Sequence, residues 1–129
     1  MNLGRVSVVM TQNVVIEKLS TGIAGLDEAT EGGLPKGRTT LVSGTAGSGK
    51  TVLASQFLVE GIRRYQQPGV FVTFEESPAD IRRNVMSLGW TVAEYEEKNQ
   101  WAFVDASPQL GEEEVVTGRY DLGALLARI

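Results

Sequence analysis

The sequence predicts an α/β fold, a mostly parallel sheet flanked by helices. Short β-branched and aromatic runs at 39–43, 70–74 and 101–105 are typical of strands. Between them lie segments with helical spacing or helix-capping residues, at 50–65 and 78–88. Strands that alternate with helices favour parallel pairing through right-handed crossovers, with helices covering the sheet faces.

Composition limits the chemistry. The chain has 129 residues, of which 42% are hydrophobic and 22% charged, as in one globular domain. Its net charge of −4 argues against a strongly electropositive face for nucleic acid. With no Cys and no His, disulfides, thiolate metal sites and histidine bases are excluded. No apolar run suits a signal peptide or approaches the roughly 18 residues of a spanning helix, so we expect a cytoplasmic protein without a membrane partner.

The N-terminal third is expected to be rich in turns. Paired β-branched residues within 8–16 predict one or two short strands. Residues 21–37 contain five glycines and Pro35, a composition of turns around one helical turn near Leu26 to Thr30. Residues 39–43 then read as the first strand of the parallel sheet.

The middle of the chain predicts a helix and a strand. From Lys50 to about Tyr65 apolar residues recur at helical spacing, and Pro68 ends the element. Val70 to Phe74 is then expected to be a largely buried strand.

Two capped helices are expected next. Ser77 is an N-cap candidate before Pro78, and Gly89 suits the end of a helix that covers about Pro78 to Leu88. Thr91 and Glu94 have the spacing of a capping box, which predicts a short helix to Lys98.

The chain ends in a way that predicts an incomplete sheet. Trp101 to Asp105 is the last of only three clear strand candidates, fewer than the 4–6 of a typical sheet. After Asp121 the leucines begin an amphipathic pattern that runs to the last residue, Ile129, with no capping residue. We therefore expect a fold that is incomplete at its C-terminus.

A phosphate-binding motif follows the first strand of the predicted sheet. Residues 44–51 satisfy G-x-x-x-x-G-K-[ST] and lie between a predicted strand and a predicted helix, the context that the motif requires. Backbone amides of such a loop point at phosphate oxygens at the positive end of the helix dipole. Lys50 is expected to reach the β and γ phosphates, and the hydroxyl of Thr51 to bind Mg²⁺. The predicted nucleotide-binding residues are Gly44, Thr45, Ala46, Gly47, Ser48, Gly49, Lys50 and Thr51.

Acidic residues stand at the ends of two predicted strands. Glu75 and Glu76 follow the strand that ends at Phe74, at the edge where open α/β sheets bind ligands. One of them is a candidate to polarise an attacking water, and a solvated pair in a loop is the alternative. Asp105 imitates a metal-binding aspartate, but ordinary turn chemistry with Ser107 explains it better.

The paired arginines and the tryptophans receive no functional role. Arginine pairs on predicted helices are usually solvated or bound to partners on the same helix. Neither tryptophan lies in a basic, glycine-rich stretch, so core packing is favoured over base stacking. These residues are Arg63, Arg64, Arg82, Arg83, Trp90 and Trp101.

Several of these segments together resemble the KaiC-like ATPases, a family of the RecA-like group. The similarity covers nearly all of the chain after residue 17, and it is greatest with the first ATPase domain of the family's circadian clock members. The segments that carry it are 21–27, 32–38, the 44–51 loop, 69–78, 88–90 and 103–108.

The resemblance implies an ATP-binding, ATP-hydrolysing RecA-like core that forms a hexameric homo-oligomeric ring, with regulatory protein partners and a role in circadian timing or signalling. Glu75 and Glu76 match the family's catalytic glutamate pair, and Lys50 joins them as a catalytic residue. Residues 1–16 are expected to be an N-terminal strand or interface segment, and 17–129 the N-terminal part of one ATPase domain. The family's metal-binding aspartate lies on a later strand, and protein serine/threonine kinase activity belongs only to longer members.

Two other functions remain open. A recombinase or helicase would use the same core on DNA, although the acidic balance disfavours it. A fragment that binds nucleotide without hydrolysing it is the second alternative.

Overall fold

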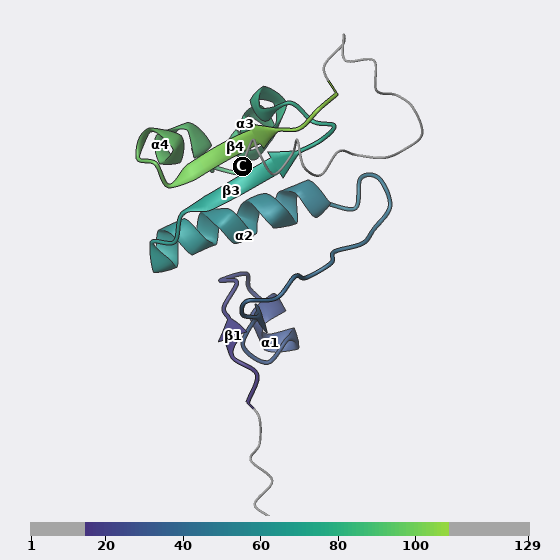
Figure 1. Ribbon diagram of the computed structural model, residues 1–129, viewed down its shortest axis with the longest axis vertical. Helices are drawn as coiled ribbons and strands as arrows, with labels where there is room; N and C mark the ends of the chain where they lie inside the picture. The colour runs from purple at the N-terminus through teal and green to yellow at the C-terminus, as the bar shows by residue number, and fades with distance from the viewer. Residues whose placement is uncertain (1–14, 109–129) are drawn as a thin grey trace, which may run out of the picture.

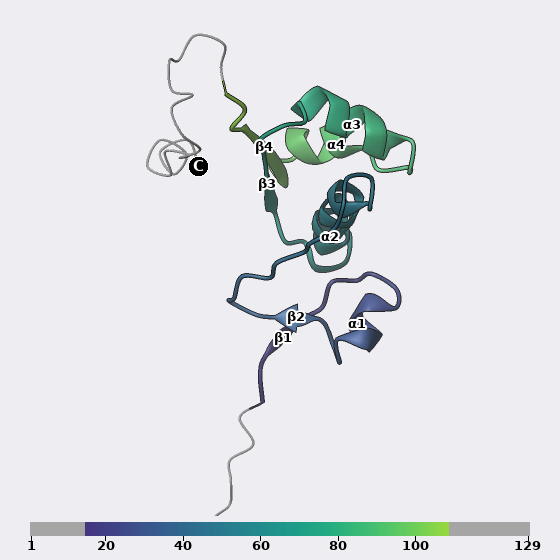
Figure 2. The ribbon, with the colours of Figure 1, turned by 90° about the vertical axis from the view of Figure 1, so that its right-hand side faces the viewer.

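The structure, a computed structural model, describes residues 15–108, and a parallel pair of strands organises its larger part (Figure 1). Strand β3 (Gly69–Thr73) pairs with β4 (Trp101–Asp105), with Gly69 opposite Trp101 and Thr73 opposite Asp105. The carboxyl ends of both strands therefore meet at one edge. The strands expected at 70–74 and 101–105 are confirmed, the first shifted by one residue at both ends. The expectation that this first strand is largely buried is wrong: Val70 is 50% exposed and only Thr73 is buried, because among residues 15–108 helices cover one face of the pair (Figure 2).

Three helices lie on the same face of this pair. Figure 2 shows β3 and β4 nearly edge-on, with α2 (Lys50–Tyr65), α3 (Pro78–Met86) and α4 (Val92–Glu97) all to one side. Helix α2 packs on β3, α4 packs on β4, and α3 lies against both α2 and α4. The predicted α/β class is confirmed.

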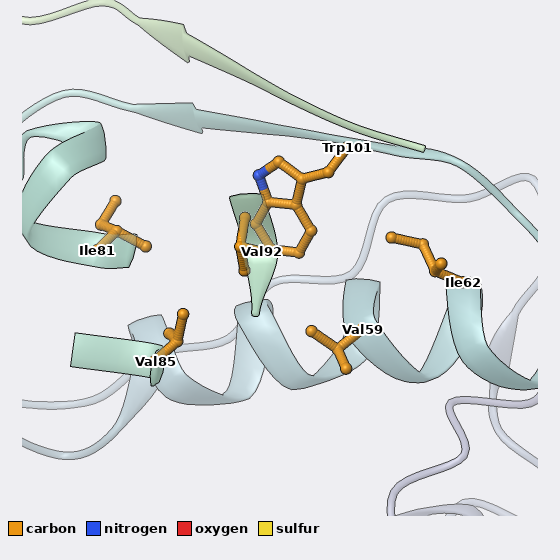
Figure 3. Packing of buried hydrophobic residues seen from close by; sticks show 6 residues of the cluster. All are labelled: Val59, Ile62, Ile81, Val85, Val92 and Trp101. Carbon is orange, nitrogen blue, oxygen red and sulfur yellow. The ribbon is translucent and has the colours of Figure 1, made fainter. Parts of the chain in front are cut away.

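The hydrophobic core fills the space between these helices and the sheet. Its aliphatic side chains are at most 4% exposed, and together with the buried tryptophan they lie between the strands and the helices (Figure 3). The buried side chains come from α2, α3, α4 and β4, so the core depends on all four elements. Its members are Val59, Ile62, Ile81, Val85, Val92 and Trp101.

Helix α2 begins directly at the predicted phosphate loop. Gly49 occupies the N-cap with a φ of +90°, a left-handed conformation that glycine adopts without steric cost. The helix buries Ser55, Val59 and Ile62, which share one face at helical spacing. Arginines in its last turn favour the negative end of the helix dipole, and the helix ends before Pro68, as predicted.

Helix α3 confirms its predicted N-cap and ends earlier than expected. The hydroxyl of Ser77 accepts a hydrogen bond from the main-chain N–H of Asp80 at 3.1 Å. The helix stops at Met86 rather than at Leu88. Gly89 takes a φ of +82°, and the main-chain N–H of Trp90 donates back to the carbonyl of Val85, which closes the end of the helix.

The capping box expected for α4 is wrong. Thr91 makes no side-chain cap, and its main-chain carbonyl, not its hydroxyl, accepts from the N–H of Glu94 at 3.1 Å. With ψ at 73°, Thr91 lies outside the extended conformation from which a capping hydroxyl reaches that N–H. The helix itself forms, over Val92–Glu97.

A smaller unit precedes the phosphate loop. Strands β1 (Lys18–Leu19) and β2 (Leu34–Pro35) pair antiparallel, with α1 (Leu26–Ala29) between them. The single helical turn near Leu26 is confirmed, while the pairing of β1 with β2 was not predicted. At Gly33 a Cβ atom would lie 2.0 Å from the carbonyl oxygen of Leu19, so only glycine fits.

One predicted strand does not form. Residues 39–43 are irregular between β2 and α2, and Leu41 is 89% exposed. A β-branched segment forms a strand only where a neighbour takes up its backbone hydrogen bonds, and within 15–108 no strand pairs with this one.

Two other predicted elements fall largely or wholly outside the described residues. Most of the segment 8–16 does so, and its described end, Val15 and Ile16, is not a strand. The helix expected after Asp121 lies entirely outside.

Candidate functional site

The phosphate loop lies at the N-terminal end of α2, and the surface there is open. All residues from 41 to 50 are exposed. Gly47 has a φ of +78° and Gly49 of +90°, and the N–H of Ser48 turns back to the carbonyl of Thr45 at 3.2 Å. At Gly44 a Cβ atom would meet the Ser48 hydroxyl at 2.4 Å. The glycines therefore allow the curled backbone that the motif predicts.

The ammonium group of Lys50 reaches back over this loop. Its Nζ donates to the carbonyl oxygens of Gly44 at 2.8 Å and Thr45 at 2.9 Å, and Ser48 Oγ lies 3.5 Å away. The one long cation of the motif is thus held against its own loop. The ammonium therefore lies over the loop that the motif predicts to bind phosphate.

The side chains of Thr51, in the first turn of α2, and Glu76, in the turn after β3, contact each other. Thr51 Oγ1 donates to Glu76 Oε1 at 2.7 Å, although 25 residues separate them in the sequence. Both side chains are half-buried. A predicted metal ligand and a predicted catalytic carboxylate therefore form one group at the mouth of the loop.

The two glutamates differ in their surroundings. Glu76 is half-buried and bound to Thr51, whereas Glu75 is exposed to solvent. Asp105 also lies at this sheet edge, opposite Thr73, and its Oδ1 accepts from the N–H of Ser107 at 2.9 Å. That contact is the turn chemistry the sequence favoured for Asp105.

The residues present suit Mg²⁺ bound together with phosphates. Within 15–108 no cluster of three or more acidic residues forms a ready-made cation cage. Mg²⁺ is usually held by one or two protein oxygens, with phosphates and waters completing its shell. The adjacent oxygens of Thr51 and Glu76 are hard donors of that kind.

A second polar cluster, at Asp27, lies near the opposite end of α2. The carboxylate of Asp27 accepts hydrogen bonds from the hydroxyls of Ser20 and Thr21 and from the main-chain N–H groups of Thr21 and Gly22. The Thr21 hydroxyl, followed by that of Ser20, holds the pKa of Asp27 well below its usual range. Tyr65 at the end of α2 donates to Ser20 at 2.7 Å. The cluster joins the small N-terminal unit to α2.

The sequence analysis did not identify two residues that hold these sites together. The first is Asp27, and the second is Thr73, whose hydroxyl donates to the main-chain carbonyl of Glu76 at 2.6 Å. Threonine side chains often bond to the main chain a few residues away in turns, so the position of Thr73 at the end of a predicted strand could have indicated this hydrogen bond.

Three of the four paired arginines bind carboxylates. Arg64 binds Glu60 one turn earlier, and Arg83 binds Asp80. Arg82 binds both carboxylate oxygens of Glu96, which raises its pKa, and lies 4.9 Å from the centre of the Phe103 ring. Trp101 is buried and stacks on Phe71, and Trp90 packs against the core. Packing explains the tryptophans, and ion pairs explain these arginines.

A family model described as "ATPase: KaiC" matches residues 19–129, most of the chain. The chain belongs to the KaiC ATPase family. This result confirms the family, and the RecA-like fold, that the sequence resemblance indicated.

Curated relatives of this chain include circadian clock proteins. The chain is 60% identical over 114 residues to the circadian clock protein KaiC3 of Synechocystis sp. and 54% identical over 114 residues to the circadian clock oscillator protein KaiC of Parathermosynechococcus lividus. Each alignment covers 88% of this chain. A Prochlorococcus marinus KaiC is 48% identical over 119 residues, or 92% of the chain. The chain spans only 21% to 24% of the length of these relatives. Among residues 15–108, none of the helices combines the length and apolar character needed to cross a bilayer.

Proposed function

We propose that this chain binds ATP with Mg²⁺ and carries the hydrolytic machinery of a KaiC-family ATPase. The observation that carries the proposal is the hydrogen bond from Thr51 to Glu76 at the mouth of the phosphate loop. It brings together a hydroxyl of the kind that binds Mg²⁺ and a carboxylate of the kind that activates water, beside the lysine of the same loop.

Each residue then has a defined task. The amides of residues 44–50 and the Lys50 ammonium bind the phosphate oxygens, and Thr51 offers its hydroxyl to the metal. Bound Mg²⁺ neutralises negative charge on the phosphates. Glu76 orients a water molecule and accepts its proton, while the exposed Glu75 adds negative charge next to it.

Equilibrium binding of a fluorescent ATP analogue, with and without Mg²⁺, tests this assignment. Wild type should bind more tightly with Mg²⁺. In Thr51→Val the Mg²⁺-dependent gain should be lost while Mg²⁺-free binding persists, and Thr51→Ser, which keeps the hydroxyl, should retain the gain. A wild-type chain that binds no nucleotide, or a Thr51→Val chain with the full gain, would contradict the proposal.

The wider biological role is proposed on the family and its clock relatives. A homo-hexameric ring, regulatory protein partners, a cytoplasmic location and a role in circadian timing or signalling all stay predictions for this chain. The DNA-directed alternative loses support because Arg64, Arg82 and Arg83 bind carboxylates. A filter-binding assay with single-stranded DNA at low salt separates the two functions, since only a recombinase or helicase should retain the strand.

A further inference from the structure

Thr73, the last residue of β3, lies between the sheet and the glutamate pair. Its side chain is buried, with 6% exposure, and its hydroxyl donates to the main-chain carbonyl of Glu76 at 2.6 Å. Its own carbonyl accepts from the N–H of Ala106 at 2.8 Å, just beyond β4. Thr73 thus links the turn after β3 to the end of β3 and to the residue that follows β4.

The turn that Thr73 closes carries both glutamates. Phe74 and Glu75 form the tip of the turn, and Glu76 returns toward the sheet. Beyond it, Ser77 is fixed as the N-cap of α3 by the N–H of Asp80. Glu76 is therefore restrained on both sides along the backbone, and its carboxylate lies 2.7 Å from the Thr51 hydroxyl.

We propose that Thr73 is a positioning residue, whose hydroxyl fixes the β3–α3 turn so that Glu76 rather than Glu75 meets Thr51. The catalytic part of this inference rests on the proposed function, since it assumes that Glu76 acts on water. The geometric part does not depend on nucleotide at all.

The side-chain chemistry at this position supports a role for the hydroxyl itself. Valine has the shape of threonine and suits a strand at least as well, so sheet packing alone gives no reason for a hydroxyl. A buried hydroxyl needs a hydrogen-bond partner, and this one uses the carbonyl of the glutamate that contacts the loop. Replacing it with a methyl group leaves that carbonyl without its donor and frees the turn.

Selective methyl labelling of threonine gives a direct readout at Thr51 in the ligand-free chain. In Thr73→Val the Thr51 methyl signal should move toward its position in Glu76→Ala, which lacks the acceptor. In Thr73→Ser, the matched control that keeps the hydroxyl, it should stay at its wild-type position. The proposal is overturned if the Thr51 methyl signal stays at its wild-type position in Thr73→Val. It is also overturned if that signal does not move in Glu76→Ala.

A measurement on the wild-type chain covers the case in which Thr73→Val fails to fold. In mixed H₂O and D₂O, a buried hydroxyl that donates a hydrogen bond exchanges slowly. Its carbon Cβ should then give separate signals for the protonated and deuterated forms. One averaged signal for Thr73 would contradict the hydrogen bond on which the inference depends.

Turnover of Mg²⁺·ATP by the same chain tests the catalytic part. Thr73→Val should lower kcat by at least about tenfold with KM near wild type, because a misplaced group costs rate more than binding, and Thr73→Ser should restore it. An unchanged kcat overturns the positioning role. If the wild-type chain shows no turnover, the proposed function fails, while the methyl signals still decide whether Thr73 positions Glu76.

Discussion

Replacement of Lys50 by alanine removes the one side-chain cation that the phosphate loop holds. Its ammonium lies within 2.8–2.9 Å of the carbonyls of Gly44 and Thr45. Those carbonyls carry only partial charge, whereas phosphate oxygens carry nearly full charge. Two unit charges about 3 Å apart interact by about 1.4 kcal/mol in bulk water and by about 5.5 kcal/mol at an effective dielectric constant of 20. The exposure of the loop puts the site near the lower value.

We therefore expect Lys50→Ala to weaken ATP binding by about 2–3 kcal/mol, or roughly 30- to 150-fold in Kd. The variant should fold, because water can reach the two exposed carbonyls that lose their donor. Isothermal titration calorimetry measures the change. Lys36→Ala removes an exposed lysine that is paired with Glu17, and it is the matched control with an unchanged Kd. A Kd for Lys50→Ala within about threefold of wild type would refute the charge argument.

Three further predictions use matched changes. Glu76→Gln should lower ATP hydrolysis by about 100-fold or more, as loss of a general base does, and Glu75→Gln by less than about tenfold; equal losses in a phosphate-release assay would contradict a division between them. The pKa of Asp27 is lower in the folded chain than its ordinary value of 3.8, so this carboxylate stabilises the fold at pH values above 3.8. That stabilisation is lost as the pH falls from 3.8 toward the pKa of the folded state. The thermal unfolding temperature of Asp27→Asn should therefore depend less on acid pH than that of wild type. Ile81→Ala, in the core at 0% exposure, should cost about 2–5 kcal/mol in urea unfolding, whereas Met86→Ala on the same helix, at 60% exposure, should stay within about 0.5 kcal/mol.

Elements that local chemistry specifies were predictable. The helix over Lys50–Tyr65 begins at glycines and ends before a proline, and Ser77 caps α3 by a bond that spans three residues. The strand expected at 39–43 was not predictable in the same way, because a strand depends on its neighbour. Leu41 has the composition of a strand residue but lies almost fully exposed.

The site follows the same division between local and long-range information. The loop residues and Lys50 come from one contiguous motif. The placement of Glu76 near that loop followed from the rule that parallel strands present their carboxyl ends at one edge. What the sequence left open was which of two adjacent glutamates would face the loop, because that depends on the path of one turn. We assign that choice to the buried hydroxyl of Thr73, which binds the main-chain carbonyl of Glu76.

Two hydrogen bonds from two different elements converge on Glu76. Thr73 in β3 binds its main chain, and Thr51 in α2 binds its side chain. A carboxylate restrained at both ends loses little further conformational freedom when it must hold a water molecule in line with a phosphate, which is the entropy that positioned groups save. Glu75, exposed at the tip of the turn, must still lose that freedom. Adjacent carboxylates of equal chemistry are therefore expected to contribute unequally, and the difference comes from the backbone that carries them.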